Sequence, residues 1–590
     1  MIHTNQTLRK DKTMNSNAII ASHLHSAEAT PPELPDDYAM FDDGVYYLPQ
    51  DGLSDPIYVC SPLRIDATRR SPNGTGWGKL VSVRAPDGSW RDISVTNSDL
   101  TCHPSKVVGK LVDHGLELGA DRKSKERLLD LLRAWKPGQS MLCVERSGWV
   151  DSTYSAFVAG GAVLGDQRVV PKLPAGGHVS ATSRMGSAGE WKAEVGLRCI
   201  GNPLMILAAS VAFSGPLLAP LGMPSGGVHF RGASSSGKTT LLRLAASAWG
   251  SPDLISPWRA TSNGLEATAA ALNGMLLPLD EIAEIAPRDL HAAIYMLGNG
   301  SGKARMTMEG TLQDTKRWQL AYLSSGEISA ADKLAEAGVS AMAGHEVRLI
   351  DIESDAHTYG VFDDLHGETS PAKFADTVRR ASQTAYGTAG PAFVEYCIEI
   401  IGKGKLEVLR SAVDRYAASW VLDLPSAPDG QIERVAQRLA LVAISGTVAT
   451  KAGLTGWGSA EARDAAHRAF LDWYDYRYAS KREASDAFVS GLQRHVAANL
   501  SGMPDVQGPF AAGVCPDEMR DETRAYFSPV AWGHVFRGLD ATKAAKALFD
   551  MGLLLGGDGA RLMRKAPRSV PGRPRLYVID LKKLGAYRAN

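Results

Sequence analysis

The first quarter of the chain alternates short apolar runs with turn-forming residues. Three such runs cover residues 45–48, 57–60 and 79–83. Runs of this length, separated by glycine, proline and aspartate, predict short β-strands. Helical periodicity follows, and strand-like runs return near Gly148. The pattern predicts a β-rich N-terminal domain with helices over residues 38–185. A polar tail, residues 1–37, precedes it and is expected to be disordered.

The remaining regions differ in their periodicity. Mixed strand and helix signals predict an α/β core over residues 186–355, and helical periodicity with almost no strand signal predicts a helical lid over 356–500. A stretch rich in glycine and proline predicts a linker over 501–525. Two helices followed by two strands then predict a winged helix over 526–590.

One uncharged stretch, residues 203–223, is long enough to cross a membrane. Gly215, Pro216 and Pro220 interrupt it, and alanines and serines dilute it. Because it leads directly into the next apolar strand, we expect a buried helix that ends near Ser214 rather than a membrane span.

Composition narrows the class of protein. Lys and Arg together number 64, as do Asp and Glu, so no global positive field indicates nucleic acid. A ring that threads DNA needs positive charge only along its pore. The six cysteines form no C-x-x-C pair, which argues against a zinc site and a disulfide framework and favours a reducing cytoplasm. The polar start lacks the apolar core of a signal peptide.

The most specific chemical signal is a complete G-x-x-x-x-G-K-[ST] motif at residues 232–239. It lies between an apolar run and a helix-forming run, as a phosphate-binding loop requires; a glycine-rich linker is the alternative. Small residues let backbone N–H groups surround phosphates, and the following helix favours negative charge. Lys238 is expected to reach the β- and γ-phosphates of ATP, and Thr239 to bind Mg²⁺. The candidate nucleotide-binding residues here are Gly232, Ser234, Ser235, Ser236, Gly237, Lys238, Thr239 and Thr240.

An apolar strand, residues 275–279, ends in Asp280 and Glu281. We expect Asp280 to bind the metal and Glu281 to polarise the attacking water. The adjacent glutamate favours an ATPase over a small-molecule kinase. Pro278 cannot donate to a sheet, so it predicts a bulge or a later start of the strand.

Two further positions are candidate parts of the reaction. A second apolar strand ends in Ser324 and Ser325, where a polar side chain can sense the γ-phosphate, and Ser325 is the first choice. Arg348 stands where an arginine finger acting in trans would complete the site of a neighbouring subunit. The alternative for Arg348 is a structural ion pair with Asp351 or Glu346.

The C-terminal region carries an excess of basic residues. Residues 541–551 are the expected recognition helix, and the loop after it is the expected wing. Local positive charge of this kind suits contacts to DNA phosphates, with a solvated basic tail as the alternative. The candidate contacts are Arg564, Lys565, Arg568, Arg573 and Arg575.

Several motifs in combination resemble a bacterial mobile-element family. The family carries the labels of a domain of unknown function and of "superfamily II helicase and inactivated derivatives", and it includes the Cch-type cassette-chromosome helicases. The resemblance extends from about Asp42 to the carboxyl end. The order of elements is similar to that of an AAA+ ATPase of the MCM-like branch. The segments that carry the resemblance are 234–240, 258–266, 279–281, 298–305, 323–327 and 344–348.

The resemblance implies a hexameric ring that moves along DNA. It implies the roles given above for Lys238, Thr239, Asp280, Glu281, Ser325 and Arg348. It adds Lys303 and Arg305 as DNA contacts of a pore hairpin, for which a solvated surface hairpin is the alternative, and Arg434 as the arginine of a sensor-2 helix. The chain lacks the Ser-Arg-Phe-Asp finger motif and the zinc-binding N-terminal insert of MCM proteins.

The sequence therefore predicts a multidomain α/β protein with a P-loop AAA+ core, in which helices flank a parallel sheet, and with the three other regions described above. The predicted function is an ATP-dependent DNA helicase or translocase that serves replication of a mobile genetic element. ATP and Mg²⁺ are the expected cofactors, and DNA and copies of the same chain are the expected partners, with no membrane. Two alternatives stay open: an AAA+ initiator or loader that remodels DNA without processive unwinding, and a DNA-binding regulator with a degenerate ATPase.

Overall fold

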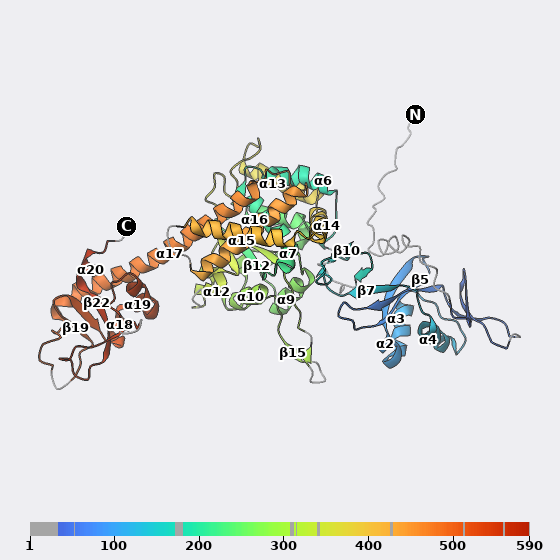
Figure 1. Ribbon diagram of the computed structural model, residues 1–590, viewed down its shortest axis with the longest axis horizontal. Coiled ribbons are helices and arrows are strands. Elements are labelled where there is room, and N and C mark those ends of the chain that lie inside the picture. The colour runs from blue at the N-terminus through green and yellow to red at the C-terminus, as the bar shows by residue number, and fades with distance from the viewer. Residues whose placement is uncertain are drawn as a thin grey trace, which may run out of the picture. The chain divides into compact units, whose positions relative to one another are not determined.

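The computed structural model describes residues 34–51, 54–171, 181–306, 312–313, 315–338, 343–424, 429–510, 514–557 and 561–588. Contacts divide the chain into two compact units, Met1–Leu471 and Asp472–Asn590 (Figure 1). Most of the tail that we expected to be disordered lies outside the described residues.

The N-terminal part of the first unit contains a five-stranded sheet in the order β11-β7-β4-β5-β6. Helices α2, α3 and α4 contribute apolar side chains to the same core as this sheet. Strands β2, β3 and β5 confirm the runs predicted at 45–48, 57–60 and 79–83. A separate three-stranded sheet consists of β1 (Tyr38–Phe41), β2 (Gly44–Tyr47) and β3 (Ile57–Cys60). The strands of the five-stranded sheet are β4 (Leu63–Arg70), β5 (Gly78–Arg84), β6 (Trp90–Thr96), β7 (Ser140–Val144) and β11 (Val169–Pro171); the helices are α2 (Asn97–Cys102), α3 (Pro104–Asp113) and α4 (Ser124–Ala134).

A small sheet connects this region to the rest of the first unit. It consists of β8 (Gly148–Trp149), β9 (Ala156–Ala159) and β10 (Ala162–Gly165). Asn273 donates a hydrogen bond of 2.6 Å to the carbonyl of Ser147, and a side chain at Gly148 would meet Asn273 at 2.4 Å. These residues, which we assigned to an N-terminal domain, therefore pack against the core.

The core of the first unit is a five-stranded parallel sheet in the order β13-β14-β17-β12-β18. Its middle strands are buried, as is usual where helices cover both faces of a parallel sheet. The strands are β12 (Gly226–Arg231), β13 (Ser256–Pro257), β14 (Leu276–Asp280), β17 (Ala321–Gly326) and β18 (Leu349–Glu353). The helices of this region are α6 (Ala188–Trp191), α7 (Pro203–Leu221), α8 (Lys238–Ser247), α9 (Ser262–Ala271), α10 (Pro287–Asn299), α11 (Ala330–Ala335) and α12 (Ala343–Glu346).

Pro278 lies inside β14 without a bulge. The carbonyl of Asp280 accepts a hydrogen bond from the N–H of Trp258, on the β13 side. Pro278 lies two residues earlier and so faces the same side, where β13 pairs only from Leu279 onward. A missing N–H at this position therefore costs the sheet little.

Helix α7 is buried, as predicted, but it does not end near Ser214. It continues to Leu221 through Pro216 and Pro220, and Gly222 ends it in a left-handed conformation with φ of 69°. Over the residues that the structure describes, α7 is the one helix long and apolar enough to cross a membrane, and 94% of that window is buried within the protein. It is therefore a core helix.

Two tryptophans explain how α7 tolerates two prolines. Pro216 leaves the carbonyl of Ala212 without its helical donor, and Pro220 does the same to the carbonyl of Pro216. The indole N–H of Trp249 donates to the Ala212 oxygen at 2.8 Å, and that of Trp149 donates to the Pro216 oxygen at 2.7 Å. Both carbonyls thus have the partner that burial requires.

A β-hairpin follows α10. Its strands are β15 (Arg305–Met306) and β16 (Leu312–Gln313), which pair antiparallel. Figure 1 shows β15 standing away from the body of the first unit. The paired strands confirm the predicted hairpin, whose tip around Glu309 lies outside the described residues.

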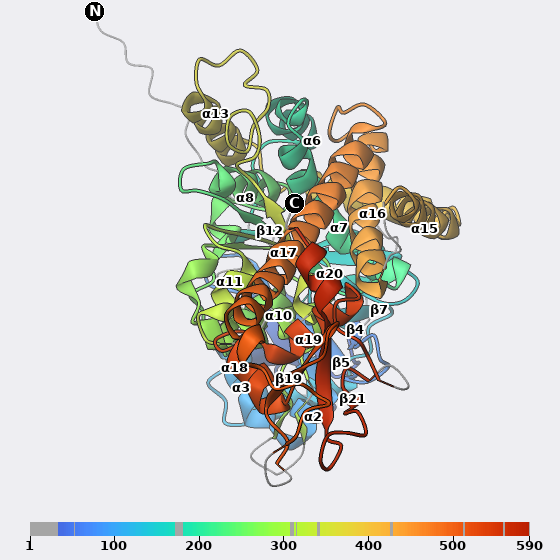
Figure 2. The same ribbon diagram turned by 90° about the vertical axis from the view of Figure 1, so that its left-hand side faces the viewer.

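The region after the sheet is helical, and it contains no strand among residues 371–424 and 429–499. Helices α15 and α16 pack against each other, and α16 packs on α7 (Figure 2). The predicted end of the lid at residue 500 is wrong. The last helix of this region, α17, contributes Phe488 and Leu492 from its C-terminal part to the core of the second unit. The helices are α13 (Pro371–Thr384), α14 (Ala389–Gly402), α15 (Leu406–Leu422), α16 (Gly430–Lys451) and α17 (Glu461–Asn499).

The second unit contains a four-stranded antiparallel sheet in the order β19-β20-β22-β21. The predicted linker, 501–525, is wrong at its C-terminal end, because β19 and the start of β20 lie there and pair within this sheet. The expected helix, helix, strand, strand order is present. The elements are β19 (Glu518–Arg520), β20 (Arg524–Phe527), α18 (Pro529–Val535), α19 (Ala541–Asp550), β21 (Arg564–Lys565), β22 (Arg575–Asp580) and α20 (Leu581–Ala586).

Candidate nucleotide-binding site

The glycine-rich loop connects the carboxyl end of β12 to the first turn of α8. Gly237 has φ of 104°, and Ser235 has φ of 63°, so both adopt left-handed conformations. A side chain at Gly237 would also meet Val361 at 2.6 Å. The loop therefore has the backbone shape and the helix terminus that suit a phosphate group.

The amine of Lys238 lies over this loop. It donates to the carbonyl oxygens of Gly232 at 2.8 Å and Ala233 at 2.6 Å, and Lys238 is 8% exposed. Ser234 and Ser235 are exposed, whereas Ser236 and Thr239 are half-buried. The positive charge is thus held at the centre of the curled backbone.

The predicted carboxylates lie at the same end of the sheet, at the carboxyl end of β14. The hydroxyl of Ser325, on the neighbouring strand β17, donates to Asp280 Oδ1 and accepts from the backbone N–H of Glu281 at 3.3 Å. Glu281 has φ of 57°, a conformation that costs a residue with a side chain about 1–3 kcal/mol. Three predicted residues therefore meet directly.

Ser324, the second choice for a sensor, has a different environment. Its hydroxyl accepts from the indole N–H of Trp258 at 2.8 Å and lies 2.8 Å from Nδ1 of His229. Nε2 of His229 lies 3.0 Å from the carbonyl of Ile328, which assigns the proton to Nε2 and makes Nδ1 the acceptor. Burial lowers the pKa of His229 to about 4, so the ring is neutral. Ser324 is thus part of a buried network, and Ser325 faces the carboxylates.

A segment that the sequence analysis missed lies against the glycine-rich loop. Asp355 accepts from the backbone N–H of Ala233 at 2.7 Å, and the N–H of Val361 donates to the carbonyl of Ser236 at 2.9 Å. The only sequence signal for it is the polar run that follows β18. The segment 354–361 fixes the loop from outside.

Arg348 lies at the opposite, amino end of the sheet. Its carbonyl accepts from the N–H of Gly227 at 2.9 Å, at the start of β12, whereas the glycine-rich loop follows the end of that strand. Five residues of extended strand span roughly 16 Å. The structure does not bring Arg348 to the glycine-rich loop of its own chain. Nor does it show an ion pair with Asp351, whose Oδ2 accepts from the N–H of Ala330 at 3.2 Å.

Arg434 is likewise not placed beside the glycine-rich loop. It is exposed on α16. One turn later on the same helix, Arg438 donates to the carbonyl of Pro224 at 3.3 Å, at the amino end of β12. The prediction that Arg434 binds nucleotide therefore finds no support within one chain.

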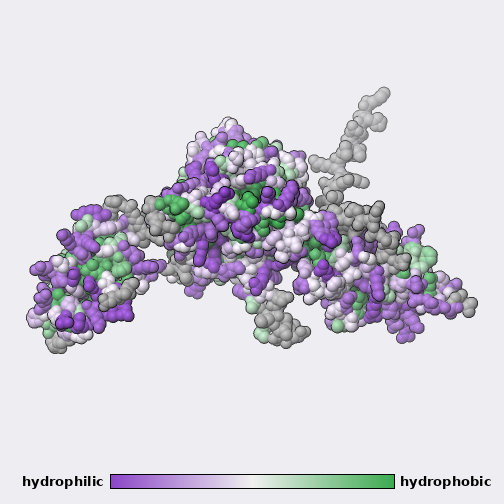
Figure 3. All heavy atoms as spheres, viewed as in Figure 1, coloured by the Kyte–Doolittle hydropathy of each residue, from purple (hydrophilic) through white to green (hydrophobic). Residues whose placement is uncertain are grey.

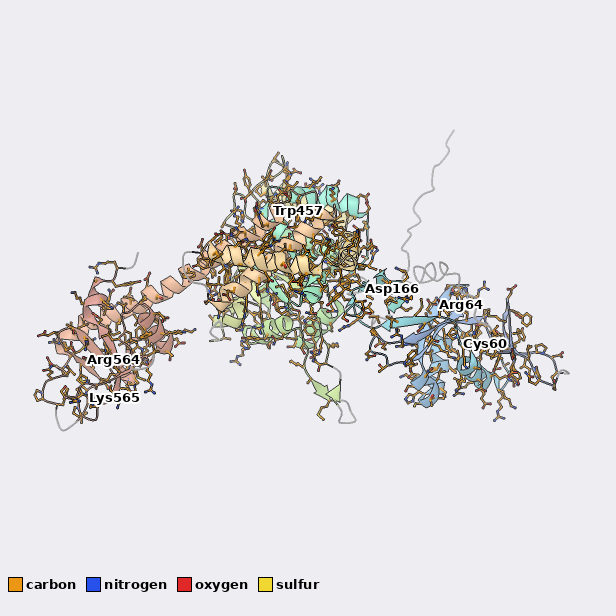
Figure 4. The ribbon with its side chains drawn as sticks, viewed as in Figure 1. Cys60, Arg64, Asp166, Trp457, Arg564 and Lys565 are labelled. Atoms are coloured by element: carbon orange, nitrogen blue, oxygen red, sulfur yellow. The ribbon has the colours of Figure 1, made fainter. Side chains whose placement is uncertain are left out.

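The candidate DNA contacts lie in two regions. Lys303 is exposed at the base of the β15–β16 hairpin, and its backbone N–H donates to Glu266 at 3.3 Å. Arg305 begins β15. In the second unit, Arg564 and Lys565 form β21, as Figure 4 labels them. Figure 3 shows hydrophilic residues over much of this unit's surface.

The other predicted arginines of the second unit lie in the loop between β21 and β22 and at the start of β22. Arg568 and Arg573 are exposed, and Arg575 is half-buried. Nε of Arg573 donates to the carbonyl of Ala566 at 3.2 Å, and Arg575 donates to that of Met563 at 3.3 Å. These bonds use part of each guanidinium and leave further donors for another ligand.

No cysteine forms a disulfide; all six lie among the described residues. Over the same part of the chain, no group of three or more histidine, cysteine or acidic side chains is arranged to hold a metal ion.

The site defines the class of fold: a parallel α/β domain with a glycine-rich loop after β12 and carboxylates at the carboxyl end of β14 in the same sheet. Residues 38–317 match the family model described as "Domain of unknown function (DUF927)". No curated protein matches the sequence.

Among solved structures, the chain is similar to one described as "SCCmec type IV Cch - active helicase". The TM-score is 0.66 at 17% sequence identity, over 93% of this chain and 99% of that one. At this identity the likeness establishes the fold. The C-terminal region of NrS-1 is also matched, with a TM-score of 0.26 at 10% identity, over 66% of this chain and 86% of that one, and this weak likeness carries no further argument.

Proposed function

We propose that the chain is an ATP-dependent DNA helicase or translocase of a mobile genetic element. The observation that carries the proposal is the meeting of Lys238, Asp280, Glu281 and Ser325 at one end of the parallel sheet. The fold likeness to Cch, a protein described as an active helicase, supports the same reading. The motor would belong to the MCM-like branch of AAA+ ATPases and serve DNA replication.

The residues of the site fit ATP and Mg²⁺. Mg²⁺ is held by one or two protein oxygens together with substrate phosphates, which Asp280 and Thr239 can supply. Ser325 donates to Asp280 Oδ1 only, so Oδ2 remains for a metal. When bound, the ion would neutralise charge on the phosphates. Lys238 would balance the charge of the γ-phosphate, and Glu281 would orient the attacking water.

A ring, predicted to be a hexamer, supplies what one chain lacks. Arg348 lies at the end of the sheet opposite the loop of its own chain, and an arginine there can serve a neighbour's nucleotide. Arg434 lies on the helix that passes the same end and would act in the same way. The exposed hairpin base at Lys303, with Arg305, would contact a single strand in the pore.

The second unit would bind duplex DNA as a winged helix. Helix α19 has Lys543 and Lys546 on its exposed face, and the loop between β21 and β22 would be the wing. Replacing Arg568 and Arg573 by glutamate should weaken duplex binding at least tenfold and reduce its salt dependence. A Kd unchanged at 100 mM salt would count against this role.

The test is unwinding of a forked DNA duplex by the purified chain, measured beside a Glu281→Gln variant. We expect the wild type to hydrolyse ATP and separate the strands, and the variant to bind ATP and stall. Hydrolysis that DNA stimulates without strand separation would instead support an initiator or loader. No hydrolysis in the presence of DNA would refute the motor.

A further inference from the structure

The side chain of Arg348 is held by three neighbours. Asn299 Oδ1 accepts from its Nη2 at 2.9 Å and from its Nε at 3.3 Å, and the carbonyl of Gly344 accepts from Nη1 at 2.8 Å. The guanidinium also stands over the ring of Tyr295, 4.5 Å from its centroid. An exposed arginine normally samples many rotamers, and these contacts select one of them.

The contacts leave specific donors available. A guanidinium has five N–H groups, and the contacts among the described residues use one on each nitrogen. One N–H is left on Nη1 and one on Nη2. An N–H group left on each terminal nitrogen lets the guanidinium donate to phosphate oxygens. Arg348 is half-buried, so this end of the side chain reaches the surface.

The close approach of Arg348 to α10 depends on a glycine. A side chain at Gly298 would lie 2.6 Å from Cδ of Arg348 and 2.7 Å from its Cγ. Tyr295 and Asn299 are four residues apart, on one face of the helix. Within segment 298–305, which resembles the mobile-element family, the sequence analysis assigned no role to Gly298 and Asn299, and these contacts give them one.

Helix α10 also connects the two ends of the sheet. A short helical turn, Ile282–Glu284, follows Glu281, and α10 begins at Pro287. The helix ends at Asn299, and a side chain added at the next residue, Gly300, would lie 3.5 Å from the hydroxyl of Ser225, just before β12. Thirteen residues of α-helix span about 20 Å. One helix thus runs from the carboxylates of a chain to Arg348 of the same chain, which we propose acts on the adjacent subunit.

We propose that Asn299 and Tyr295 are positioning residues that aim Arg348 at the nucleotide of the adjacent subunit. The inference rests on the proposed function, because it requires a ring in which Arg348 acts in trans. Asn299 fixes the plane of the guanidinium, and Tyr295 supports its face. Neither residue contacts the nucleotide of either subunit.

The experiment measures DNA-stimulated hydrolysis by the full chain carrying Asn299→Ala, with Arg288→Ala, an exposed position in the first turn of α10, as the matched control. We expect Asn299→Ala to lower kcat about tenfold to 100-fold while KM for ATP changes less than twofold. Tyr295→Phe, which keeps the ring, should lose less activity than Tyr295→Leu. Loss of assembly, measured by size-exclusion chromatography, would overturn the proposal.

Mixing subunits separates a role in trans from a structural role. Asn299→Ala subunits keep an intact nucleotide site, and Lys238→Ala subunits keep an intact Arg348. Their mixture should hydrolyse ATP faster than the sum of the two alone. A mixture with no gain would overturn the proposal. If Arg348→Ala alone leaves hydrolysis unchanged, the trans finger itself fails; if it abolishes hydrolysis while Asn299→Ala and Tyr295→Leu do not, only the positioning role fails.

Discussion

The two ends of the central sheet are built in different ways. At the carboxyl end, backbone conformation shapes the site. The end consists of a curled loop, residues in left-handed conformations and a serine that contacts both carboxylate residues. At the amino end, one side chain, Arg348, is held by other side chains of α10. A site built from backbone suits the close fit to phosphate that we propose for the glycine-rich loop. A side chain held by its neighbours suits the reach into an adjacent subunit that we propose for Arg348.

The difference suggests a division of labour within each chain. The carboxyl end holds the glycine-rich loop and the carboxylates that we propose bind ATP, and the amino end holds an arginine that does not reach them, since roughly 16 Å of strand separate the two ends. Under the proposed function, a chain of this design would complete its reaction only through a copy of itself. Four predictions test this comparison.

Lys238→Ala should have the largest effect, because it removes the charge held inside the loop. We expect ATP binding to be lost and hydrolysis to fall by more than about 10³-fold. Calorimetry and a phosphate-release assay would measure the two effects. Lys373→Ala, an exposed position in the first turn of α13, is the control. Retained binding would mean that the loop does not bind phosphate.

Arg348→Ala should lower hydrolysis by about 10³-fold and leave the Kd for ATP within about twofold. The reason is that this arginine does not reach the loop of its own chain. A parallel loss of binding would place Arg348 in its own chain's site and remove the contrast between the two ends.

The adjacent serines should separate function from stability. Ser325→Ala removes the hydroxyl that bonds to Asp280 and should lower hydrolysis about 10²-fold with little change in Tm. Ser324→Ala leaves His229 and Trp258 without their partner, and we expect a loss of about 1–3 kcal/mol in stability with hydrolysis largely kept. The opposite pattern would exchange the roles of the two residues.

The smallest expected effect concerns Asp351, on β18 between the two ends. Burial raises its pKa to about 7. Between its ordinary value near 4 and pH 7, the folded chain binds more protons than the unfolded chain at this site, so its contribution to stability falls as pH rises. The Tm of Asp351→Asn relative to wild type should therefore increase by about 2 °C from pH 5 to pH 8. A difference independent of pH would contradict the raised pKa.

The contribution of His229 to stability changes with pH in the opposite direction to that of Asp351. Its pKa, lowered to about 4 by burial, makes the folded chain bind fewer protons than the unfolded chain between about pH 4 and 6.5, so its contribution to stability rises with pH. Because the two contributions oppose each other, the wild-type Tm alone is a poor probe, and the comparison with Asp351→Asn isolates one of them.

The sequence predicts the carboxyl end of the sheet well and the amino end poorly. The loop, Asp280, Glu281 and Ser325 follow from local motifs at strand ends, because β12, β14 and β17 are parallel and bring their ends together. The partners of Arg348 come from a helix about fifty residues earlier, and no local pattern reveals them. The same is true of segment 354–361, which packs on the loop only because β18 lies beside β12.

The predicted ends of helix α7 and of the linker before the second unit are wrong, because contacts with other elements override the local sequence signals there. Prolines predicted the end of a helix near Ser214, but indoles from outside the helix satisfy the carbonyls that the prolines expose. A linker was expected where β19 begins, since short polar strands carry little apolar signal. The indoles that decide the first case lie far from the prolines in the sequence. In the second case β19 pairs with the next strand, β20, and the distant strand β22 pairs in turn with β20.

Each proline inside α7 is paired with the tryptophan that donates to the carbonyl it exposes, so a substitution of one residue during evolution limits the substitutions that the other tolerates. Alanine in place of Pro216 would restore a helical N–H, and that N–H would compete with Trp249 for the oxygen of Ala212. A substitution that would stabilise an ordinary helix would here leave a buried indole N–H without its acceptor. If the tryptophan were replaced first, the carbonyl would lose its donor. We expect descendants of this chain to change such a pair together or to keep both.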